Sequence, residues 1–189
     1  MRSGNEIKFE LGVNLIMELK QQIEEVFQAA QSGDAERLSA ILEAHSELAN
    51  TENEQGLTPL GYAAHFGNRD AVQVLLDNGA DVNAVSHSKL SYIPSNTALH
   101  AAIAGERSID VIKLLLMKQA QTTIFDSNGH TCLHTAAFHD DNIEIIRLLI
   151  EHGAEVNAAM EDGETALTLA IKQGNNHVAE LLRSIGATG

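Results

Sequence analysis

Pairs of short apolar segments, separated by polar turns, recur along most of the chain. In residues 56–68, GLTPLGYAAHFGN, apolar side chains stand three and four positions apart, which predicts a short helix with one buried face. Residues 71–84, AVQVLLDNGADVNA, repeat that spacing and predict a second helix that ends at Gly79. Thr58 is suited to cap the first helix, and Pro59 suits its first position, where a missing N–H does no harm. The unit is therefore a helix, a turn, a second helix and an extended turn.

This unit recurs at a nearly fixed spacing. Thr58, Thr97, Thr131 and Thr165 each head a copy, and they stand 39, 34 and 34 residues apart. A degenerate copy without the threonine occupies residues 26–50. No single unit can enclose its own core, so the units must stack side by side. The leucines that the apolar stripes place in this shared core are Leu60, Leu75, Leu76, Leu99, Leu115, Leu133, Leu149, Leu167 and Leu182.

Two copies carry a specific signature. TPLGYAA…LLDNGADVNA and TCLHTAA…LLIEHGAEVNA resemble ankyrin repeats, which combine a TPLH-type tetrapeptide, two antiparallel helices and a hairpin-like loop. The array is similar to compact, stand-alone ankyrin proteins of bacterial type. The resemblance implies an all-α ankyrin-repeat solenoid of about five stacked helix-turn-helix-loop units, with capping repeats at the N- and C-terminal ends. Within residues 23–189 the expected repeats span about 24–57, 58–96, 97–130, 131–164 and 165–189.

Residues 1–22 lie outside the repeats. Their apolar positions alternate at first and then take a helical spacing from Leu15 onward, so we expect a helix toward the end of this extension. Our first interpretation is that this helix extends the first repeat and covers its open end. One alternative is a dimerisation or partner-binding segment. Another is that the first sixteen residues are a leader, because the more ankyrin-like stretch MELKQQIEEV begins at Met17.

Charge narrows the range of partners. The chain has 12 basic and 26 acidic residues, a formal net charge of −14. Such a surface repels nucleic acid and anionic membranes, so we expect neither as a partner and favour a protein with a basic segment. No apolar run is long enough to span a bilayer, and the N-terminus lacks the features of a secretory signal. The single cysteine, Cys132, has no internal disulfide partner, which predicts a cytoplasmic protein.

The family resemblance implies a function. Ankyrin-like proteins are overwhelmingly protein-protein interaction modules, so we expect a non-catalytic adaptor, scaffold or inhibitor, with no cofactor, metal or catalytic residues. In this family the two residues after the alanine pair of each first helix point into a concave groove. Here those pairs are His65/Phe66, Ala104/Gly105, Phe138/His139 and Lys172/Gln173. The small pair between two aromatic ones predicts a shallow apolar depression. We expect the double change Phe66→Ala, Phe138→Ala to abolish partner capture and leave the fold nearly unchanged. The alternative is that both rings pack inward under the loop, in which case the double variant unfolds.

One loop departs from the repeat length. VSHSKLSYIPSN, residues 85–96, contains about six residues more than the family pattern, and insertions in solenoids tend to lie on the binding face. A neutral insertion costs little and is the alternative. The apolar cluster and the stiffening proline favour a partner contact. The complete predicted binding surface is His65, Phe66, Tyr92, Ile93, Pro94, Phe138 and His139, with an acidic rim at Glu54, Glu161, Asp162 and Glu164.

The histidines raise an alternative function. His130 and His134 have the i, i+4 spacing of helical metal ligands, and His139, Asp140 and Cys132 are near them in sequence. A small-molecule or metal-dependent activity on this face is therefore the competing hypothesis. Against it, the family holds the histidine of the tetrapeptide by local hydrogen bonds that join neighbouring repeats. We expect Cys132 to be a buried filler, because it replaces the proline of that tetrapeptide.

Three turn residues also allow specific predictions. Gln119 stands where other copies have the glycine that ends the second helix, so we expect a less tightly capped helix there. Asn83 and Asn157 resemble the asparagine-hydroxylation sites of some ankyrin proteins. We expect instead that each amide bonds to its own backbone, as loop asparagines often do.

Overall fold

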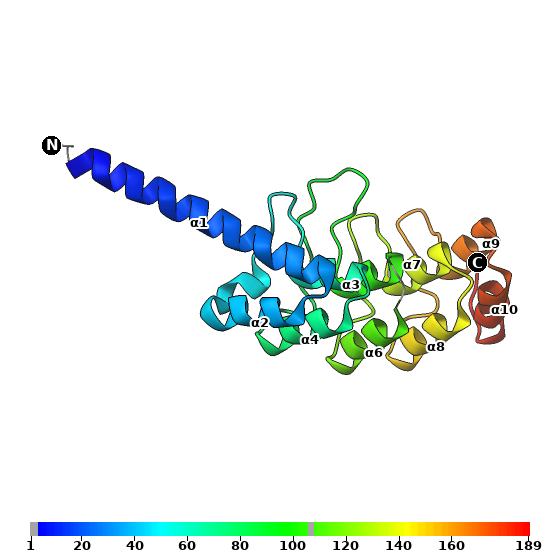
Figure 1. Ribbon diagram of the computed structural model, residues 1–189. Coiled ribbons are helices and arrows are strands. Elements are labelled where there is room, and N and C mark those ends of the chain that lie inside the picture. Colours follow the sequence, from blue (N-terminus) through cyan, green and yellow to red (C-terminus); the bar gives the residue numbers. More distant parts are fainter. Residues whose placement is uncertain (1–3, 106–107) are drawn as a thin grey trace.

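The computed structural model describes residues 4–105 and 108–189 and shows an elongated stack of helix pairs (Figure 1). Within that part of the chain there is no β-strand, only an isolated antiparallel bridge between Ala159 and Thr165. The predicted all-α solenoid is confirmed. The helices, in order, are α1 (Gly4–Ser32), α2 (Ala35–Ala44), the 3-10 helix η1 (Ser46–Asn50), α3 (Pro59–His65), α4 (Arg69–Asp77), α5 (Ala98–Ala104), α6 (Ile109–Met117), α7 (Cys132–His139), α8 (Ile143–Glu151), α9 (Ala166–Gln173) and α10 (Asn176–Ser184).

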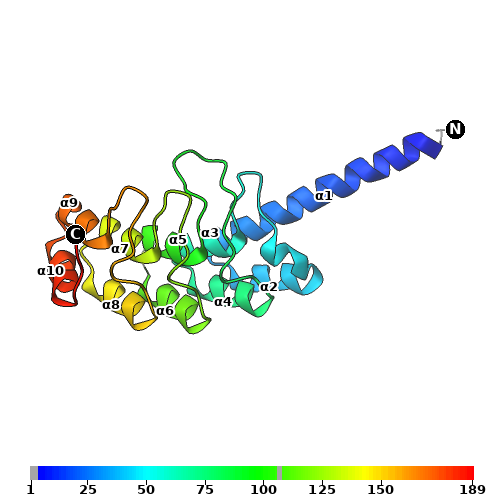
Figure 2. The same cartoon turned by 180° about the vertical axis from the view of Figure 1, so that it is seen from behind.

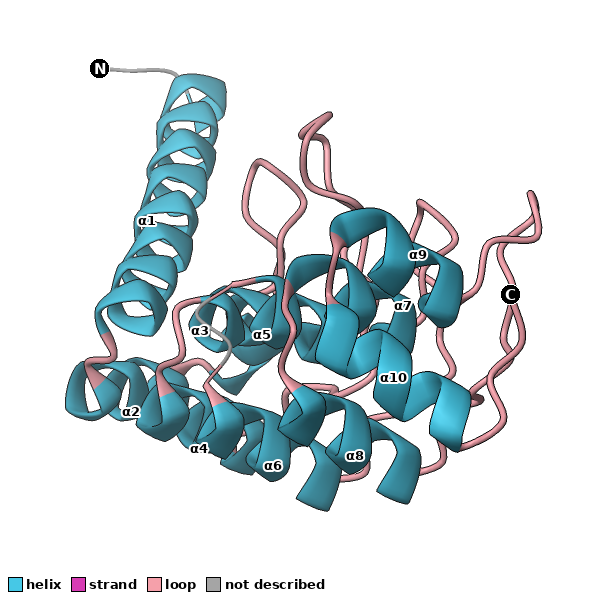
Figure 3. Cartoon of the chain, turned by 90° about the vertical axis from the view of Figure 1, so that its right-hand side faces the viewer, coloured by secondary structure: helices cyan, strands magenta, loops and turns pink. Residues whose placement is uncertain are grey.

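The helices form two layers. Helices α1, α3, α5, α7 and α9 pack in sequence to make one layer, and α2, α4, α6, α8 and α10 make the other (Figures 1 and 3). The extended loops project from the layer of first helices and stand in a row (Figure 2). The repeat boundaries expected from the sequence stay a prediction.

Helix starts follow the threonine caps. The Thr58 hydroxyl accepts a hydrogen bond from the Gly61 N–H at 3.1 Å, with Pro59 at the first position of α3. At α7 the cap is reciprocal, because the backbone N–H of Thr131 also donates to Nδ1 of His134 at 3.2 Å. These bonds pair N–H groups that the helix itself leaves unsatisfied.

The shared core is built as predicted, with one exception. Eight of the nine expected leucines are buried, but Leu76 is only half-buried. Val72 and Leu75 lie three positions apart on α4, and both face the shared core and are fully buried. Leu76 is one position further round the helix, so it lies at the edge of that buried face and only partly contacts the core.

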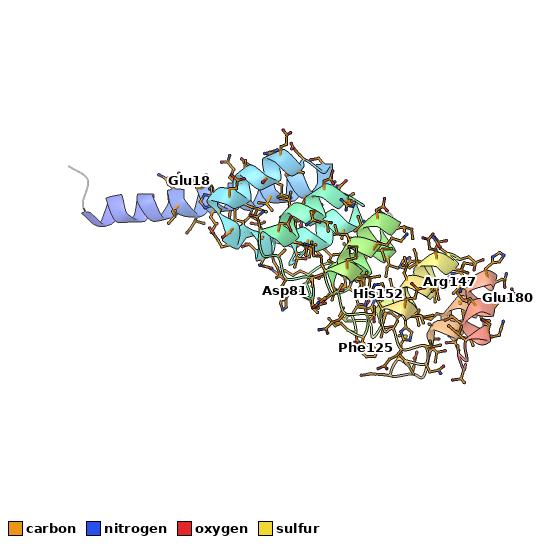
Figure 4. The ribbon with its side chains drawn as sticks, turned by 90° about the horizontal axis from the view of Figure 1, so that it is seen from below. Glu18, Asp81, Phe125, Arg147, His152 and Glu180 are labelled. Atoms are coloured by element: carbon orange, nitrogen blue, oxygen red, sulfur yellow. The ribbon has the colours of Figure 1, made fainter. Side chains whose placement is uncertain are left out.

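The N-terminal extension does not cover the first repeat. Helix α1 runs without a break from the extension into the first repeat and carries the extension away from the stack (Figures 1 and 2). Its apolar residues from 12 to 20 are exposed, including Leu15 at 67% and Met17 at 64%. Figure 4 labels Glu18 on this projecting part. The helix extends the first repeat, as expected, but the expectation that it covers the open end of that repeat is wrong, since a straight continuous helix cannot fold back over the end it starts from. No helix among the described residues has the length and apolar character needed to span a membrane.

Gln119 takes the conformation of the glycine it replaces. Its φ is +67°, the only non-glycine in the described chain with a positive value, against +86° for Gly79. The closing hydrogen bonds are equivalent: Gln119 N–H donates to Leu116 at 3.0 Å, and Gly79 N–H donates to Leu76 at 3.1 Å. The expectation of a looser cap is wrong. Glutamine in place of glycine keeps these hydrogen bonds. Its cost in free energy is backbone strain, because a residue with a side chain is disfavoured at a positive φ.

Candidate partner-binding groove

A groove of about 550 Å³ crosses the layer of first helices at α3, α5 and α7. Seven residues predicted to form the binding surface line it together: His65, Phe66, Tyr92, Ile93, Pro94, Phe138 and His139. Ala104, from the small pair predicted between the aromatic ones, lines it as well. The groove therefore draws its surface from three successive first helices and from the long loop.

Two phenylalanines form opposite sides of this groove and differ in how they are held. Phe66 is half-buried and packs edge-on against Tyr62, with ring centroids 5.2 Å apart. Tyr62 packs in turn on Phe27 of α1 at 5.3 Å. Phe138 is 40% exposed and stacks on the His130 ring at 6.4 Å. Phe66 thus belongs partly to the packing between repeats, whereas Phe138 mainly presents its ring to the groove.

Small residues between these rings keep the groove open. Gly105 follows α5, and a Cβ added there would lie 2.1 Å from the carbonyl oxygen of His65. Only glycine allows α5 to end so close to α3. Ala101 and Ala104 supply the other surface of α5 in the groove.

The long loop is fixed to its neighbours by main-chain hydrogen bonds. On one side the His87 N–H donates to the Gly56 carbonyl at 2.9 Å. On the other side the Ser127 N–H donates to the Ser95 carbonyl at 2.9 Å. The loop, which stands highest in Figure 1, carries Tyr92 with 78% of its surface exposed. It forms a wall of the groove that is hydrogen-bonded on both sides and exposes Tyr92 to solvent.

The predicted acidic rim lies outside the groove lining. Glu54 accepts a hydrogen bond from Lys20 of α1 at 2.9 Å, which lowers the pKa of the Glu54 carboxyl and raises the pKa of Lys20. Glu164 forms an ion pair with Lys172. Glu161 and Asp162 are exposed in the same loop as Glu164, before α9, and do not line the groove either. The structure separates the rim from the aromatic surface, and two of its four carboxylates already have a basic partner.

The tetrapeptide histidines are structural. His100 is buried, its Nδ1 lies 2.8 Å from the Thr97 hydroxyl, and its Nε2 lies 3.1 Å from the carbonyl oxygen of His130 in the next repeat. His134 makes the same Nδ1 contact with Thr131 at 2.8 Å. Burial lowers the pKa of both imidazoles, because it disfavours the charged form. The contacts of His100 match the expectation that these histidines join neighbouring repeats, whereas the hydrogen bonds of His134 stay within its own repeat.

The residues of the metal hypothesis do not form a ligand set. Among the described residues, no group of three or more histidine, cysteine, aspartate or glutamate side chains is placed to hold a metal ion. Cys132 is fully buried, and burial raises the pKa of its thiol. A protonated, inaccessible thiol is a poor nucleophile and a poor metal ligand.

Asparagines join successive loops in a way the sequence reasoning missed. Asn50 donates from Nδ2 to the Gly79 carbonyl at 2.8 Å, and its Oδ1 accepts the Asp81 N–H at 2.8 Å. Asn83 and Asn157 bridge to the following turn in the same way. The expectation that these amides bond to their own backbone is wrong. Their recurrence at matching positions after α2, α4 and α8 was the signal for a role between repeats.

Asp126 is an acidic groove residue that we did not predict. It lies in the loop before α7, only 8% exposed, and lines the groove beside His130 and Phe138. The available signal was its place just ahead of a tetrapeptide, where loop residues of this fold reach the concave side.

Sequence comparisons agree with this architecture. The chain matches the family model of ankyrin repeats (3 copies) over residues 26–126 and 99–188. It therefore belongs to the ankyrin-repeat family, whose members are generally protein-protein interaction modules and typically non-catalytic.

Curated relatives share this region only in part. Human Inversin is 35% identical over 107 residues, which cover 57% of this chain and 9% of Inversin. The human NAD-capped RNA hydrolase NUDT12 is 38% identical over 86 residues, covering 45% of this chain and 17% of that protein. The Neurogenic locus Notch protein of Drosophila melanogaster is 34% identical over 90 residues, covering 48% and 3%. The chain thus spans only a small fraction of the length of each of these relatives.

Proposed function

We propose that this protein is a non-catalytic interaction module, an adaptor, scaffold or inhibitor, that binds a partner protein through the concave groove and its loops. The observation that carries the proposal is the convergence of exposed aromatic and apolar side chains from α3, α5, α7 and the long loop on one groove. Aromatic anchors in a depression framed by polar residues are typical of interface hot spots. Phe138 and Tyr92 are the anchors that contact the partner most directly.

The charge of the chain supports a basic partner segment. With a net charge of −14, the protein attracts positively charged surfaces at long range and repels nucleic acid. We place the protein in the cytoplasm, where its one cysteine stays reduced.

The projecting part of α1 offers a second surface. Its apolar side chains Leu15, Ile16 and Leu19 are exposed to solvent in a monomer. Packing against the same side chains of a second copy would bury them and give a weak dimer. Sedimentation equilibrium of the wild type and of the Ile16→Glu variant tests this directly. We expect a concentration-dependent rise in mass for the wild type only. A mass that stays monomeric at all concentrations excludes the dimer and leaves the groove proposal intact.

The groove proposal is tested by capture of partners from the source cells. The groove variant combines Tyr92→Ala with Phe138→Ala, because both side chains are substantially exposed and their loss spares the core. Phe66 is left intact, since its ring contacts Tyr62. The control variant combines Met117→Ala with Ile143→Ala, which removes exposed apolar side chains from α6 and α8, away from the groove.

We expect a protein partner that the wild type and the control variant retain and the groove variant loses. Circular dichroism and thermal melting verify that all three chains are equally folded. If the groove variant retains the partner as well as the wild type does, the groove is not the binding site.

A further inference from the structure

Asp126 carries a formal negative charge into the groove. Its side chain is only 4% exposed, and it lines the same cavity as Tyr62, Phe66, Tyr92 and Phe138. Among the side chains that the structure describes, no lysine or arginine lines this cavity. The fixed charge of the groove is therefore negative, and it lies deep in the site rather than on the loop tips.

The fold does not need that charge. Oδ1 of Asp126 accepts the backbone N–H groups two and four positions later, at 2.8 and 2.9 Å. Two repeats earlier, Asn53 builds the same turn: its Oδ1 accepts the equivalent N–H groups, both at 3.0 Å. Each turn then continues to a glycine with positive φ, Gly129 and Gly56. A neutral amide is thus sufficient to form this turn, so the negative charge at position 126 is not required for the turn.

The second oxygen of Asp126 has no lysine or arginine partner within the described chain. Oδ2 lies 3.8 Å from Nδ1 of His130, which is beyond hydrogen-bond distance. None of the ion pairs among residues 12–105 and 108–189 joins Asp126 to a lysine or an arginine. A carboxylate taken out of water without a paired cation costs free energy, and a cation from outside the chain would offset that cost.

The groove around Asp126 also suits a cation. Aromatic rings attract ammonium and guanidinium groups through their faces, and they pack against the methylene stems of lysine and arginine. Phe138 and Tyr92 are exposed enough to make such contacts. A long basic side chain would therefore meet apolar walls along its stem and a carboxylate at its end.

We propose that the groove selects a protein segment that inserts one lysine or arginine side chain between the aromatic walls, with its cation paired to Asp126. This inference rests on the proposed function and adds the chemistry that the groove recognises. It also places charge recognition at Asp126 and not at the rim, where Lys20 and Lys172 already pair with Glu54 and Glu164.

The test begins with a library of short random peptides displayed on phage and selected on the full-length chain. Four chains are compared: the wild type, Asp126→Asn, the rim variant Glu161→Gln/Asp162→Asn, and the swap variant Asn53→Asp/Asp126→Asn. The swap variant keeps the wild-type net charge and moves the carboxylate to the matching turn, so it controls for general electrostatic attraction. Asn53 shows that the amide supports the turn at position 126.

We expect the wild type and the rim variant to select peptides with a lysine or arginine next to apolar residues. Asp126→Asn and the swap variant are expected to lose that selection. A selected lysine peptide is then compared with its norleucine analogue, which keeps the stem and lacks the charge. The wild type should prefer the lysine peptide by about tenfold or more, and Asp126→Asn should not distinguish the two.

The outcomes separate this inference from the proposed function. If the selected peptides lose binding to the Tyr92→Ala/Phe138→Ala chain but show no enrichment in basic residues, the inference fails and the groove proposal stands. If the basic preference survives in Asp126→Asn or returns in the swap variant, the charge at position 126 is not what is recognised. If peptides bind the groove variant as well as the wild type, the proposed function fails.

Discussion

Gly56 lies against the carbonyl group of His87, so closely that a Cβ on Gly56 would stand 1.9 Å from the His87 oxygen. This contact, with the hydrogen bond from the His87 N–H to the Gly56 carbonyl, docks the long loop onto the preceding loop. The wall of the groove that carries Tyr92 therefore depends on a glycine in a different repeat.

We predict that Gly56→Ala both destabilises the protein and weakens binding in the groove. The new methyl group must displace the His87 backbone. The φ of +76° at position 56 adds strain, because alanine disfavours this conformation. The matched control is Gly153→Ala, which has a similar φ of +89° but open space around the position. We expect about 1–2 kcal/mol of destabilisation for the control and clearly more for Gly56→Ala, measured by urea denaturation. Equal losses would show that the His87 contact does not hold the loop.

The groove was partly predictable because of how the repeats are built. A fixed repeat length brings the residue pairs after each alanine pair side by side, and the ankyrin resemblance implied that these pairs face the groove. Phe66 and Phe138, each a member of such a pair, could therefore be assigned to one surface. Tyr92 was predicted from the loop insertion, because insertions in solenoids tend to lie on the binding face. Asp126 was not found, because its place ahead of the tetrapeptide does not reveal that its side chain is buried in the groove and not exposed at a loop tip.

Other features depend on packing that a single unit does not contain. The asparagine bridges join one turn to the backbone of the next, so their partners appear only when repeats are stacked. The position of the N-terminal part of α1 was mispredicted. An apolar stripe predicts that one face of a helix is buried, but it does not show whether the first repeat reaches far enough to cover that face. Leu76 was mistaken because it lies at the edge of such a stripe.

The asparagine bridges predict a stabilising change. Thr123 stands where Asn83 and Asn157 stand in their repeats, and it is exposed. An asparagine at this position can donate to the Gly153 carbonyl and accept from the Glu155 N–H, by analogy with Asn83. We expect Thr123→Asn to raise the free energy of unfolding by about 1 kcal/mol, while Thr123→Ala gives no gain. Chemical denaturation measures both, and a Thr123→Asn chain no more stable than the alanine variant contradicts the bridge.

Gln119 predicts a second gain from relief of strain. Its φ of +67° is costly for any residue with a side chain and ordinary for glycine. Gln119→Gly should stabilise the protein by about 0.5–1 kcal/mol, less than the full strain because glycine also increases the entropy of the unfolded chain. Gln119→Ala retains the strain and serves as the control. If both variants have the same unfolding midpoint, the backbone at position 119 is not strained.

The buried histidines predict a loss of stability in mild acid. The pKa of His100 and His134 is lowered in the folded state, so below about pH 6.5 the unfolded chain binds more protons than the folded one. The free energy of unfolding should therefore fall between about pH 7.5 and pH 5.5. His177 acts in the opposite direction, because its hydrogen bond with Asp141 raises its pKa, and a His177→Gln background removes that contribution.

In that background, replacing His100 and His134 together by glutamine should flatten the pH dependence of the urea midpoint. An unchanged pH dependence in that variant would assign the acid sensitivity to other groups.

The central claim, that the partner lies in the groove, is tested most directly by photocrosslinking from two positions of equal exposure. Tyr92 stands on the wall of the groove and Met117 at the end of α6, and each is 78% exposed. A photoreactive phenylalanine analogue is placed at one position or the other, and the chain is irradiated in its source cells. We predict a covalent adduct with the captured partner from position 92 and none from position 117. An adduct formed only from position 117 would contradict the account.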